Sequence, residues 1–416
     1  MLNNMKTYLI LFSLFLAAFF VRFYNFENRI TFGPEQARSL IVSSNYIQDK
    51  PSLLGQEYFR ANSYGHKLYT SALFNYTLVP LLVLSNYDPF IITIYFSALS
   101  IFTGLILYLL SKKMFSHEVA LISTFLFLFN SYMIYHSMFI WVLNYLPLLG
   151  LLNFYLLWKI VNKKYKLVDV FWLGLISGIG FGLEYLYAIA ILVSLFVVVK
   201  FSKDIFKNLV IFILGSIVGD LPQVLFDLKH NFYHLNSLIR YAIDTFSGKS
   251  DAGFIYYHFL EFWPIGLLLL AVCLWLTYKK NKYLFFVLLS IYLFVNLKSP
   301  LISFSKPVGM IDGLKYNDLK LASEQIAEKA TSNFNVVTLY DFDTRGYTLR
   351  YFVQYVYGRK PQNDISYQDV DEIFALASSN YNFKNNNPWE LNVFKAQNVV
   401  KLDDIGSGYG LYKLTK

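Results

Sequence analysis

Long apolar segments alternate with short polar ones from residue 7 to residue 297. A helix that crosses a membrane needs about 20 apolar residues, and several of these segments need their aromatic flanks to reach that length. Nine candidates are 7–23, 89–110, 119–135, 141–158, 168–182, 185–199, 209–226, 256–278 and 283–297. The pattern predicts a multi-pass α-helical membrane protein.

The first segment could also be a secretory signal. Ala17-Ala18 is followed by further apolar residues and by Arg22, without a clear cleavage site. We therefore expect an uncleaved first span.

Lysines between the segments predict which way the chain crosses. Four clusters occur, at Lys112/Lys113, Lys159/Lys163/Lys164/Lys166, Lys200/Lys203/Lys207 and Lys279/Lys280/Lys282. Two apolar segments separate each cluster from the next, so all four fall on one side, which the positive-inside rule makes cytoplasmic. With Lys6 also inside, only two of the three apolar stretches before Lys112 can cross. Stretch 68–84 is the most polar of the three, and we expect it to form a helix in the outer interface.

This topology gives about nine crossings with a cytoplasmic amino terminus and two outer loops, 25–67 and 227–255. After residue 298 the chain changes character. An amphipathic helix is expected at 317–331, a second helix at 349–357, and strands at 335–340, 373–377, 399–402 and 410–414. We therefore expect a membrane domain over 1–298 and a small extracytoplasmic α/β domain over 299–416. Gly406, Gly408 and Gly410 suit a hairpin turn before the last strand.

Composition agrees with a membrane protein, since 56% of the residues are hydrophobic and only 15% are charged, against about a quarter charged in soluble domains. The net charge of +9 does not indicate a nucleic-acid partner, because the lysines lie between apolar segments and not on one basic face. The single cysteine, Cys273, excludes a disulfide framework. Gly174, Gly178, Gly180 and Gly182 lie within an apolar segment, where they indicate close helix packing and not a nucleotide-binding loop.

Candidate chemistry begins at Pro34-Glu35-Gln36-Ala37-Arg38, just after the first apolar segment. One interpretation is a plain helix start, with proline and an acidic residue in the first turn. The other is a general base at the membrane surface, with Glu35 in an aromatic pocket formed partly by Phe26 and Phe32. Burial there would raise the pKa of Glu35 from near 4.3 toward the range useful for deprotonating a hydroxyl. Arg38, one turn later, could hold Glu35 or bind a phosphate.

The order of these motifs is Arg22-Phe23-Tyr24, the Gly33–Arg38 stretch, Leu53-Leu54-Gly55, Leu68-Tyr69 and a span ending in Lys112-Lys113. Over roughly the first 240 residues it resembles the GT-C glycosyltransferases that use polyprenyl-phosphate sugars. Protein O-mannosyltransferases and the aminoarabinose transferases of lipid A are the nearest types. The resemblance implies that Glu35 is the catalytic acid of the first outer loop and that Arg38 is the family arginine. The chain departs from the usual pattern of Asp followed by a second acid, because Gln36 follows Glu35.

The resemblance also implies a cation before the Leu-Tyr pair, which His66 and Lys67 could supply next to Tyr69. Lys67 could instead be a lysine that extends from the interface into water. Glu184, near the outer face, is either a site residue or a turn residue in water.

Segment 226–232 matches another recurring family feature. Asp227, Lys229 and His230 could contact phosphate or acceptor, as could Arg240 further along, or the segment could be a helix end with polar caps. Asp227, His230 and His234 also have a spacing that could hold a metal.

We therefore expect a glycosyltransferase that moves a hexosyl or pentosyl group from a polyprenyl-phosphate donor, at the lipid bilayer, to a hydroxyl of a lipid, glycan or protein acceptor. Glu35 would deprotonate the acceptor, the reaction would invert the sugar carbon, and Arg38, Lys67 and Lys229 would stabilise the leaving phosphate. A divalent metal is left open as a cofactor. The expected location is a bacterial-type plasma membrane, with the site facing outward. An alternative is a transporter or flippase of a lipid-linked glycan, although the nearly charge-free centres of the spans favour the enzyme. A third interpretation is an inactive relative that binds glycan through its tail.

Overall fold

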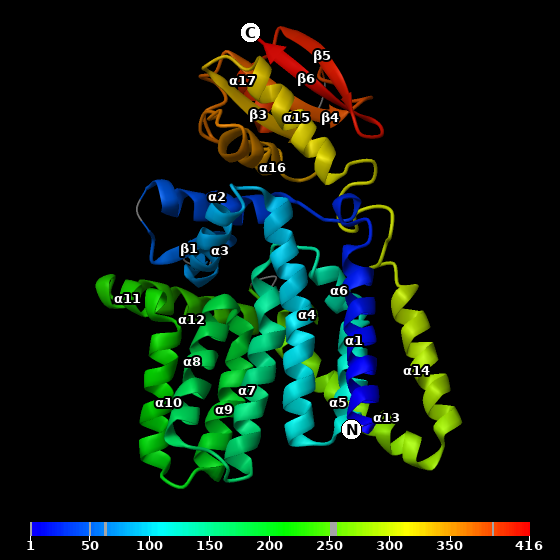
Figure 1. Cartoon of the computed structure of the whole chain (residues 1–416). Coiled ribbons are helices and arrows are strands. Elements are labelled where there is room, and N and C mark those ends of the chain that lie inside the picture. The colour runs from blue at the N-terminus through cyan, green and yellow to red at the C-terminus, as the bar shows by residue number, and fades with distance from the viewer. Residues whose placement is uncertain (1, 50, 62–64, 250–255, 385–386) are drawn as a thin grey trace.

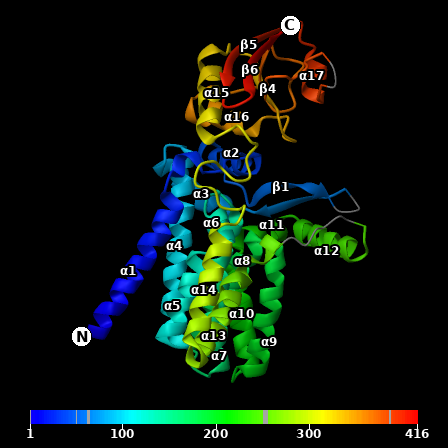
Figure 2. The same ribbon diagram turned by 90° about the vertical axis from the view of Figure 1, so that its right-hand side faces the viewer.

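The computed structural model describes residues 2–49, 51–61, 65–249, 256–384 and 387–416. A bundle of roughly parallel helices forms one end of the molecule, and an α/β layer forms the other (Figure 1). Between them lies a layer of short helices and a two-stranded hairpin, which projects to one side (Figure 2).

The bundle is built from apolar helices that agree with most of the predicted spans. Its helices are α1 (Leu2–Phe23), α4 (Pro89–Met114), α5 (His117–Leu128), α7 (Leu146–Val161), α8 (Leu167–Leu183), α9 (Ala188–Phe201), α10 (Ile205–Gly219), α13 (Trp263–Lys280) and α14 (Lys282–Leu297). Among the described residues, three stretches are long and apolar enough to cross a membrane by themselves: Pro89–Met114, Val142–Val161 and Tyr256–Lys280. The other predicted spans correspond to shorter apolar helices or to a bent pair, so the described residues do not confirm nine crossings.

Two predicted spans are not single straight helices. Segment 119–135 is broken after Leu128, and the short helix α6 (Ser131–His136) begins anew where the Asn130 side chain accepts hydrogen bonds from the N–H groups of Tyr132 and Met133. Segment 209–226 bends by 86° between α10 and α11 (Leu221–Lys229). Pro222 at the start of α11 has no N–H to continue the helix of α10, which favours a break at this point.

Glycines let α8 and α10 approach closely, as the sequence predicted. A Cβ atom on Gly174 would lie 2.1 Å from the carbonyl oxygen of Phe212, and one on Gly178 would lie 2.1 Å from that of Ser216. Neither position has room for a side chain, so backbone contact holds this helix pair together.

The middle layer comes from the first outer loop and from short helical turns. Its elements are η1 (Phe26–Asn28), α2 (Pro34–Gln48), β1 (Leu54–Ala61), β2 (Lys67–Ser71), α3 (Leu73–Leu84), η2 (Val142–Tyr145), η3 (Tyr185–Tyr187), α12 (Tyr233–Phe246) and η4 (Tyr256–Phe262). The prediction of one helix over 68–84 is wrong at its start. Residues 67–71 pair with β1 in an antiparallel hairpin, and the helix begins only at Leu73.

The C-terminal layer confirms the predicted small α/β fold. It contains α15 (Tyr316–Lys329), β3 (Phe334–Leu339), α16 (Tyr347–Tyr351), the π-helical turn η5 (Phe352–Val356), β4 (Glu372–Ser378), α17 (Trp389–Phe394), β5 (Asn398–Ile405) and β6 (Tyr409–Thr415). The sheet order is β3-β4-β6-β5, with β3 and β4 parallel and the other pairs antiparallel. The helix expected at 349–357 starts two residues earlier, and α17 was not predicted. Gly406 and Gly408 have positive φ in the turn between β5 and β6, which favours glycine.

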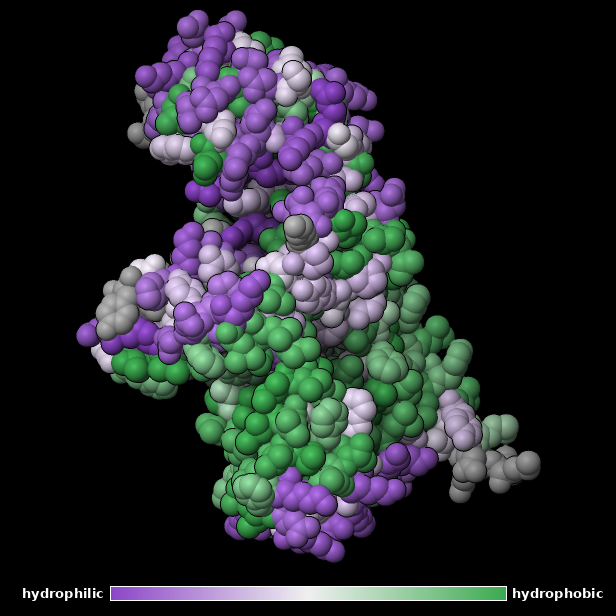
Figure 3. All heavy atoms as spheres, turned by 90° about the vertical axis from the view of Figure 1, so that its left-hand side faces the viewer, coloured by the Kyte–Doolittle hydropathy of each residue, from purple (hydrophilic) through white to green (hydrophobic). Residues whose placement is uncertain are grey.

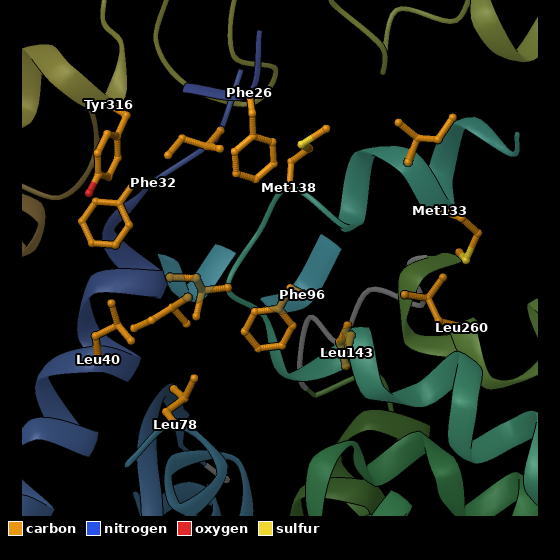
Figure 4. Packing of buried hydrophobic residues seen from close by; sticks show 14 of the residues in the cluster. Phe26, Phe32, Leu40, Leu78, Phe96, Met133, Met138, Leu143, Leu260 and Tyr316 are labelled. Carbon is orange, nitrogen blue, oxygen red and sulfur yellow. The ribbon is translucent and has the colours of Figure 1, made fainter. Parts of the chain in front are cut away.

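Phe32 joins the C-terminal layer to the rest of the chain. Its ring is buried and lies 5.2–6.2 Å from the rings of Tyr316, Tyr351 and Phe352. Figure 4 shows Phe32 and Tyr316 facing each other, beside the core of the middle layer. The same core cluster continues into the bundle, so the two ends share one apolar interior.

Hydrogen bonds seal the edge of this joint. Tyr316 Oη donates to Asp88 Oδ1 (2.5 Å), and Lys320 Nζ lies 3.2 Å from Asp88 Oδ2. Tyr355 Oη donates to Asn45 Oδ1 at 2.6 Å. We call this set of contacts around Phe32 and Asp88 the seam.

Replacing Phe32 tests the seam. Because Phe32→Ala removes a buried ring from a tightly packed site, we expect a loss of about 3–5 kcal/mol of stability. The lower melting temperature would appear in detergent by scanning fluorimetry, together with faster proteolysis between the two ends. Phe342→Ala, which truncates a ring that is 82% exposed, should leave both measurements unchanged. Equal behaviour of the two variants would contradict the role given to Phe32.

Candidate functional site

Glu35 lies at the start of α2, where the middle layer meets the C-terminal layer. Gly33 is the extended N-cap residue, Pro34 occupies the first turn and Glu35 follows, so the sequence also satisfies the rules of a plain helix start. The side chain of Glu35 is exposed. The prediction of an aromatic pocket around Glu35 is wrong. Phe26 and Phe32 are buried in the core, and the Phe32 ring packs against the aromatic rings of the seam.

Gln36 fixes the orientation of this helix start. Its side-chain oxygen accepts a hydrogen bond from the backbone N–H of Ile140, at 3.1 Å. Gln36, where the GT-C resemblance implies a second acid, therefore has a structural contact to the loop that contains Ile140.

Arg38 links three elements. Its Nη2 donates to the carbonyl oxygen of Glu57 in β1 (3.3 Å), and its guanidinium carbon lies 5.4 Å from the centre of the Tyr347 ring in α16. Stacking on a ring holds a guanidinium in place, and the planar guanidinium is a group that suits the recognition of phosphate. Arg38 lies one helical turn after Glu35, so both side chains belong to the same end of α2.

A loop of the C-terminal layer adds a carboxyl group near Arg38. Asp343 is buried and its Oδ2 accepts a hydrogen bond from the backbone N–H of Tyr347 (2.9 Å). Burial raises the pKa of Asp343 to about 6, against the opposing effects of that hydrogen bond and of Arg38 and Arg350. Nothing in the local sequence connects Asp343 and Tyr347 to Arg38, so sequence reasoning missed both.

The hairpin carries the next predicted residues. Lys67 Nζ lies 3.0 Å from Glu57 Oε1, and both side chains are more than one third exposed. The His66 ring lies 5.3 Å from that of Tyr233 in α12. The carbonyl oxygen of Tyr69 accepts hydrogen bonds from His234 Nε2 (3.0 Å) and from the Tyr185 hydroxyl. The structure thus brings Arg38 and Lys67 to opposite ends of Glu57.

A buried polar network seats the hairpin at the bend between α10 and α11. Ser71 Oγ donates to Asp220 Oδ1 at 2.8 Å, and the Gln223 amide lies 2.8 Å from Tyr185 Oη. Ser71, Asp220 and Gln223 are all buried. This network was not predicted, although a lone carboxylate inside an apolar segment is a recognised signal of a special site.

The 226–232 segment is a helix end with polar caps, one of the two interpretations left open by the sequence. Asp227 accepts hydrogen bonds from the backbone N–H groups of His234 (2.8 Å) and Leu235 (3.1 Å). His230 stacks on Phe226, with ring centres 4.1 Å apart, and its Nδ1 lies 2.8 Å from the Phe226 carbonyl oxygen.

The remaining predicted cations lie along the same segment and the following helix. Lys229 is exposed. Arg240 forms an ion pair with Asp244 (3.2 Å). Both lie on α11 or α12 and not on α2, so they form a group separate from Glu35 and Arg38.

The structure does not support a metal site at Asp227, His230 and His234, because the three side chains have the separate contacts given above. In the part of the chain that the structure describes, no group of three or more His, Cys, Asp and Glu side chains is arranged to hold a metal ion. Glu184 is neither free in water nor part of such a group. It accepts from the Leu186 N–H and pairs with His258 at 3.2 Å.

Two small cavities lie away from Glu35. One, inside the bundle, is lined by residues that include Ser100, His136 and Asn144, and the other by residues that include Arg29 and Lys306. A hollow also lies on the surface next to the hairpin. Figure 3 shows a recess between the C-terminal layer and the projecting hairpin and α12, bordered mainly by hydrophilic residues.

The fold is similar to that of ArnT from Cupriavidus metallidurans. The structure of ArnT bound to undecaprenyl phosphate matches with a TM-score of 0.53 over 96% of this chain and 97% of ArnT, at 10% identity, and apo ArnT matches with a TM-score of 0.51 at 12% identity. Archaeal oligosaccharyltransferase AglB from Archaeoglobus fulgidus, in complex with an inhibitory peptide and a dolichol-phosphate, gives a TM-score of 0.51 at 9% identity, over 90% of this chain and 69% of AglB. No protein-family model and no curated protein matches the sequence.

These comparisons establish the fold. ArnT and AglB are GT-C proteins, so the resemblance indicated by the sequence is confirmed at the level of the fold. Three described stretches that are long and apolar enough to cross a membrane support an integral membrane protein.

The raised pKa of Asp343 predicts a pH-dependent stability. Ionising this buried group costs more in the folded than in the unfolded chain, so the contribution of Asp343 to stability is greatest at acidic pH and falls as the pH rises from the ordinary value of 3.8 to about 6. Asp343→Asn cannot ionise and keeps an acceptor for Tyr347. The difference in melting temperature between Asp343→Asn and wild type should therefore increase in favour of the variant from about pH 4.5 to pH 7, by the equivalent of about 2 kcal/mol.

Scanning fluorimetry of both proteins across this range measures the effect. Asp369→Asn, at an exposed position, controls for the loss of a carboxylate. A constant difference between wild type and Asp343→Asn at all pH values would contradict the burial argument.

Proposed function

We propose that the protein is a membrane glycosyltransferase that moves a sugar from a polyprenyl-phosphate carrier to an acceptor hydroxyl. The observation that carries this proposal is the position of Glu35 and Arg38. An exposed carboxylate and a guanidinium occupy one end of α2, between an apolar bundle and an α/β layer, on the fold of ArnT. In the proposed orientation, that position lies between the lipid bilayer and the outer water.

The donor's chemistry fits this position. A polyprenyl tail remains in the bilayer and its phosphate stays at the interface, so the phosphate needs cations at that depth. Arg38 and Lys67 are proposed to bind it, since both contact Glu57 and neither is fully buried. The undecaprenyl phosphate of ArnT and the dolichol-phosphate of AglB support a lipid-phosphate ligand.

Glu35 is proposed as the general base. Its carboxylate takes the proton of the acceptor hydroxyl while the hydroxyl oxygen bonds to the anomeric carbon, and the bond from that carbon to the phosphate oxygen breaks. The electron pair of that bond leaves with the phosphate, where Arg38 stabilises the added charge. A single displacement of this kind inverts the sugar carbon. The acceptor, whether lipid, glycan or protein, would enter from the recess beneath the C-terminal layer.

The other predicted residues receive supporting roles in this proposal. Tyr69 and Asp227 hold the hairpin and α12 in place through the backbone contacts described above. His66, Lys229, His230 and Arg240 place further positive or polar groups next to the hairpin, at the end of α11 and on α12, where they would attract an anionic lipid headgroup.

We further propose that the end of the bundle opposite to Glu35 is cytoplasmic. The lysines near the ends of α4, α7, α9 and α13 all lie at the connections on that end (Figure 1). This arrangement supports the positive-inside orientation, with Glu35 and the C-terminal layer outside.

The transporter alternative gains one observation, the broken helices α5–α6 and α10–α11. Both breaks lie toward the end of the bundle that carries the middle layer (Figure 1), whereas a transporter places its broken helices near the membrane centre. The enzyme therefore remains the better-supported function.

Substitution of Glu35 tests the reaction. Purified protein in liposomes with polyprenyl-phosphate sugars should transfer sugar, and Glu35→Gln should lower the rate by about 100- to 10,000-fold, the usual contribution of a general base. Glu328→Gln, on the exposed face of α15, should keep full activity. Full activity of Glu35→Gln would remove Glu35 from the mechanism. Movement of the carrier across the bilayer without any transfer would instead support a flippase.

Substitution of Arg38 separates phosphate binding from structure. Loss of a charged hydrogen bond costs about 1.5–3 kcal/mol, so Arg38→Gln should lower kcat/KM for the donor by roughly 10- to 100-fold. Tyr347→Phe keeps the ring under the guanidinium and should remain close to wild type. Loss of activity that follows a loss of melting temperature in Arg38→Gln would indicate a purely structural role.

A further inference from the structure

The amphipathic helix α12 exposes its apolar face and buries its polar face. Its large apolar side chains lie outward and are exposed, at Phe232 (the N-cap residue), Leu235, Ile239, Ile243 and Phe246. Steps of three or four residues place all five on one side of a helix.

The opposite face is polar and buried. His234, Ser237 and Asp244 are each at most 2% exposed. A helix on a water-soluble surface has the reverse arrangement, with its apolar face inward.

Specific contacts fix this orientation. His234 Nε2 lies 3.0 Å from the Tyr69 carbonyl oxygen of β2, and Asp227 caps the first turn of α12. Because the hairpin covers the polar face, the helix cannot rotate to bury its apolar residues without losing these contacts.

The exposed apolar surface continues into the bundle. It runs from Ile213 and Ile217 on α10, around the bend at Asp220, through Leu221, Leu225 and Leu228 on α11, and onto α12. Figure 3 shows the projecting region as hydrophilic above and hydrophobic below, in line with the hydrophobic sides of the bundle.

We propose that α11 and α12, together called the arm, lie flat in the outer lipid leaflet, with the apolar residues of α12 among the lipid chains. Exposed apolar patches larger than a few hundred Å² mark interaction surfaces, and continuity with the lipid-facing sides of α10 identifies membrane lipid as the occupant. Lys229 at the end of α11 and Lys249 just after α12 are both exposed, and both can meet anionic headgroups.

The arm anchors the hairpin at headgroup depth. It does so through Tyr69 and Ser71, whatever reaction the protein catalyses.

Spin-label accessibility tests the arm directly. The full chain in a Cys273→Ser background receives one label site, at Ile239→Cys or Ile243→Cys, and is placed in vesicles of phosphatidylethanolamine and phosphatidylglycerol. Ile213→Cys on α10 serves as the lipid-exposed control and Asn380→Cys, exposed on the C-terminal layer, as the water-exposed control. The ratio of collision with oxygen to collision with a water-soluble nickel chelate reports the depth of each label.

We expect both arm positions to give a ratio close to that at Ile213 and several-fold above that at Asn380. A ratio at Ile239 and Ile243 equal to that at Asn380 would overturn the proposal. Protection from both reagents, lost on dilution into excess lipid, would show that a second copy of the chain covers the arm, and would also overturn it. Melting temperatures within a few degrees of the parent identify folded variants, and two arm positions guard against one failing to fold.

Discussion

The buried contact between Ser71 and Asp220 governs the geometry of the middle layer. Asp220 lies where α10 turns by 86° into α11, and Ser71 is the last residue of β2. A carboxylate removed from water needs hydrogen-bond donors, and the end of the hairpin supplies one. The bend, the hairpin and α12 therefore form one unit, and Lys67 reaches the neighbourhood of Arg38 as a result.

Most of the fold could be predicted from the sequence because lipid imposes a strong pattern. Helices must satisfy their own backbone in hydrocarbon, so long apolar segments identify α4, α7 and α13 directly. The strands of the C-terminal layer were recognisable by alternation. The bend at Asp220 could not be predicted, because Pro222 and one carboxylate inside an apolar segment do not specify the angle between two helices. The start of α3 was misplaced because Leu68 and Tyr69 suit a strand as well as a helix.

The candidate site was predictable only in its local part. Glu35 and Arg38 share one helix turn, and a motif reveals such neighbours. Their surroundings depend on contacts between distant parts of the chain. The Phe32 ring belongs to the seam because it packs against Tyr316 and Phe352. No pattern in the sequence around Phe32 predicts these distant partners. Similarly, the spacing of Asp227, His230 and His234 suggested a metal site, whereas the backbone of α12 uses Asp227 as a cap.

The seam has a consequence for how substrates must travel. Lifting the C-terminal layer would expose Phe32, Tyr316 and Phe352 to water and strip Asp88 of its partners. Because a hinge movement would break these contacts, we expect the layer to form a fixed roof and not a lid. If the protein is the proposed transferase, an acceptor has to enter from the side, and its width, more than its length, decides whether it can be modified.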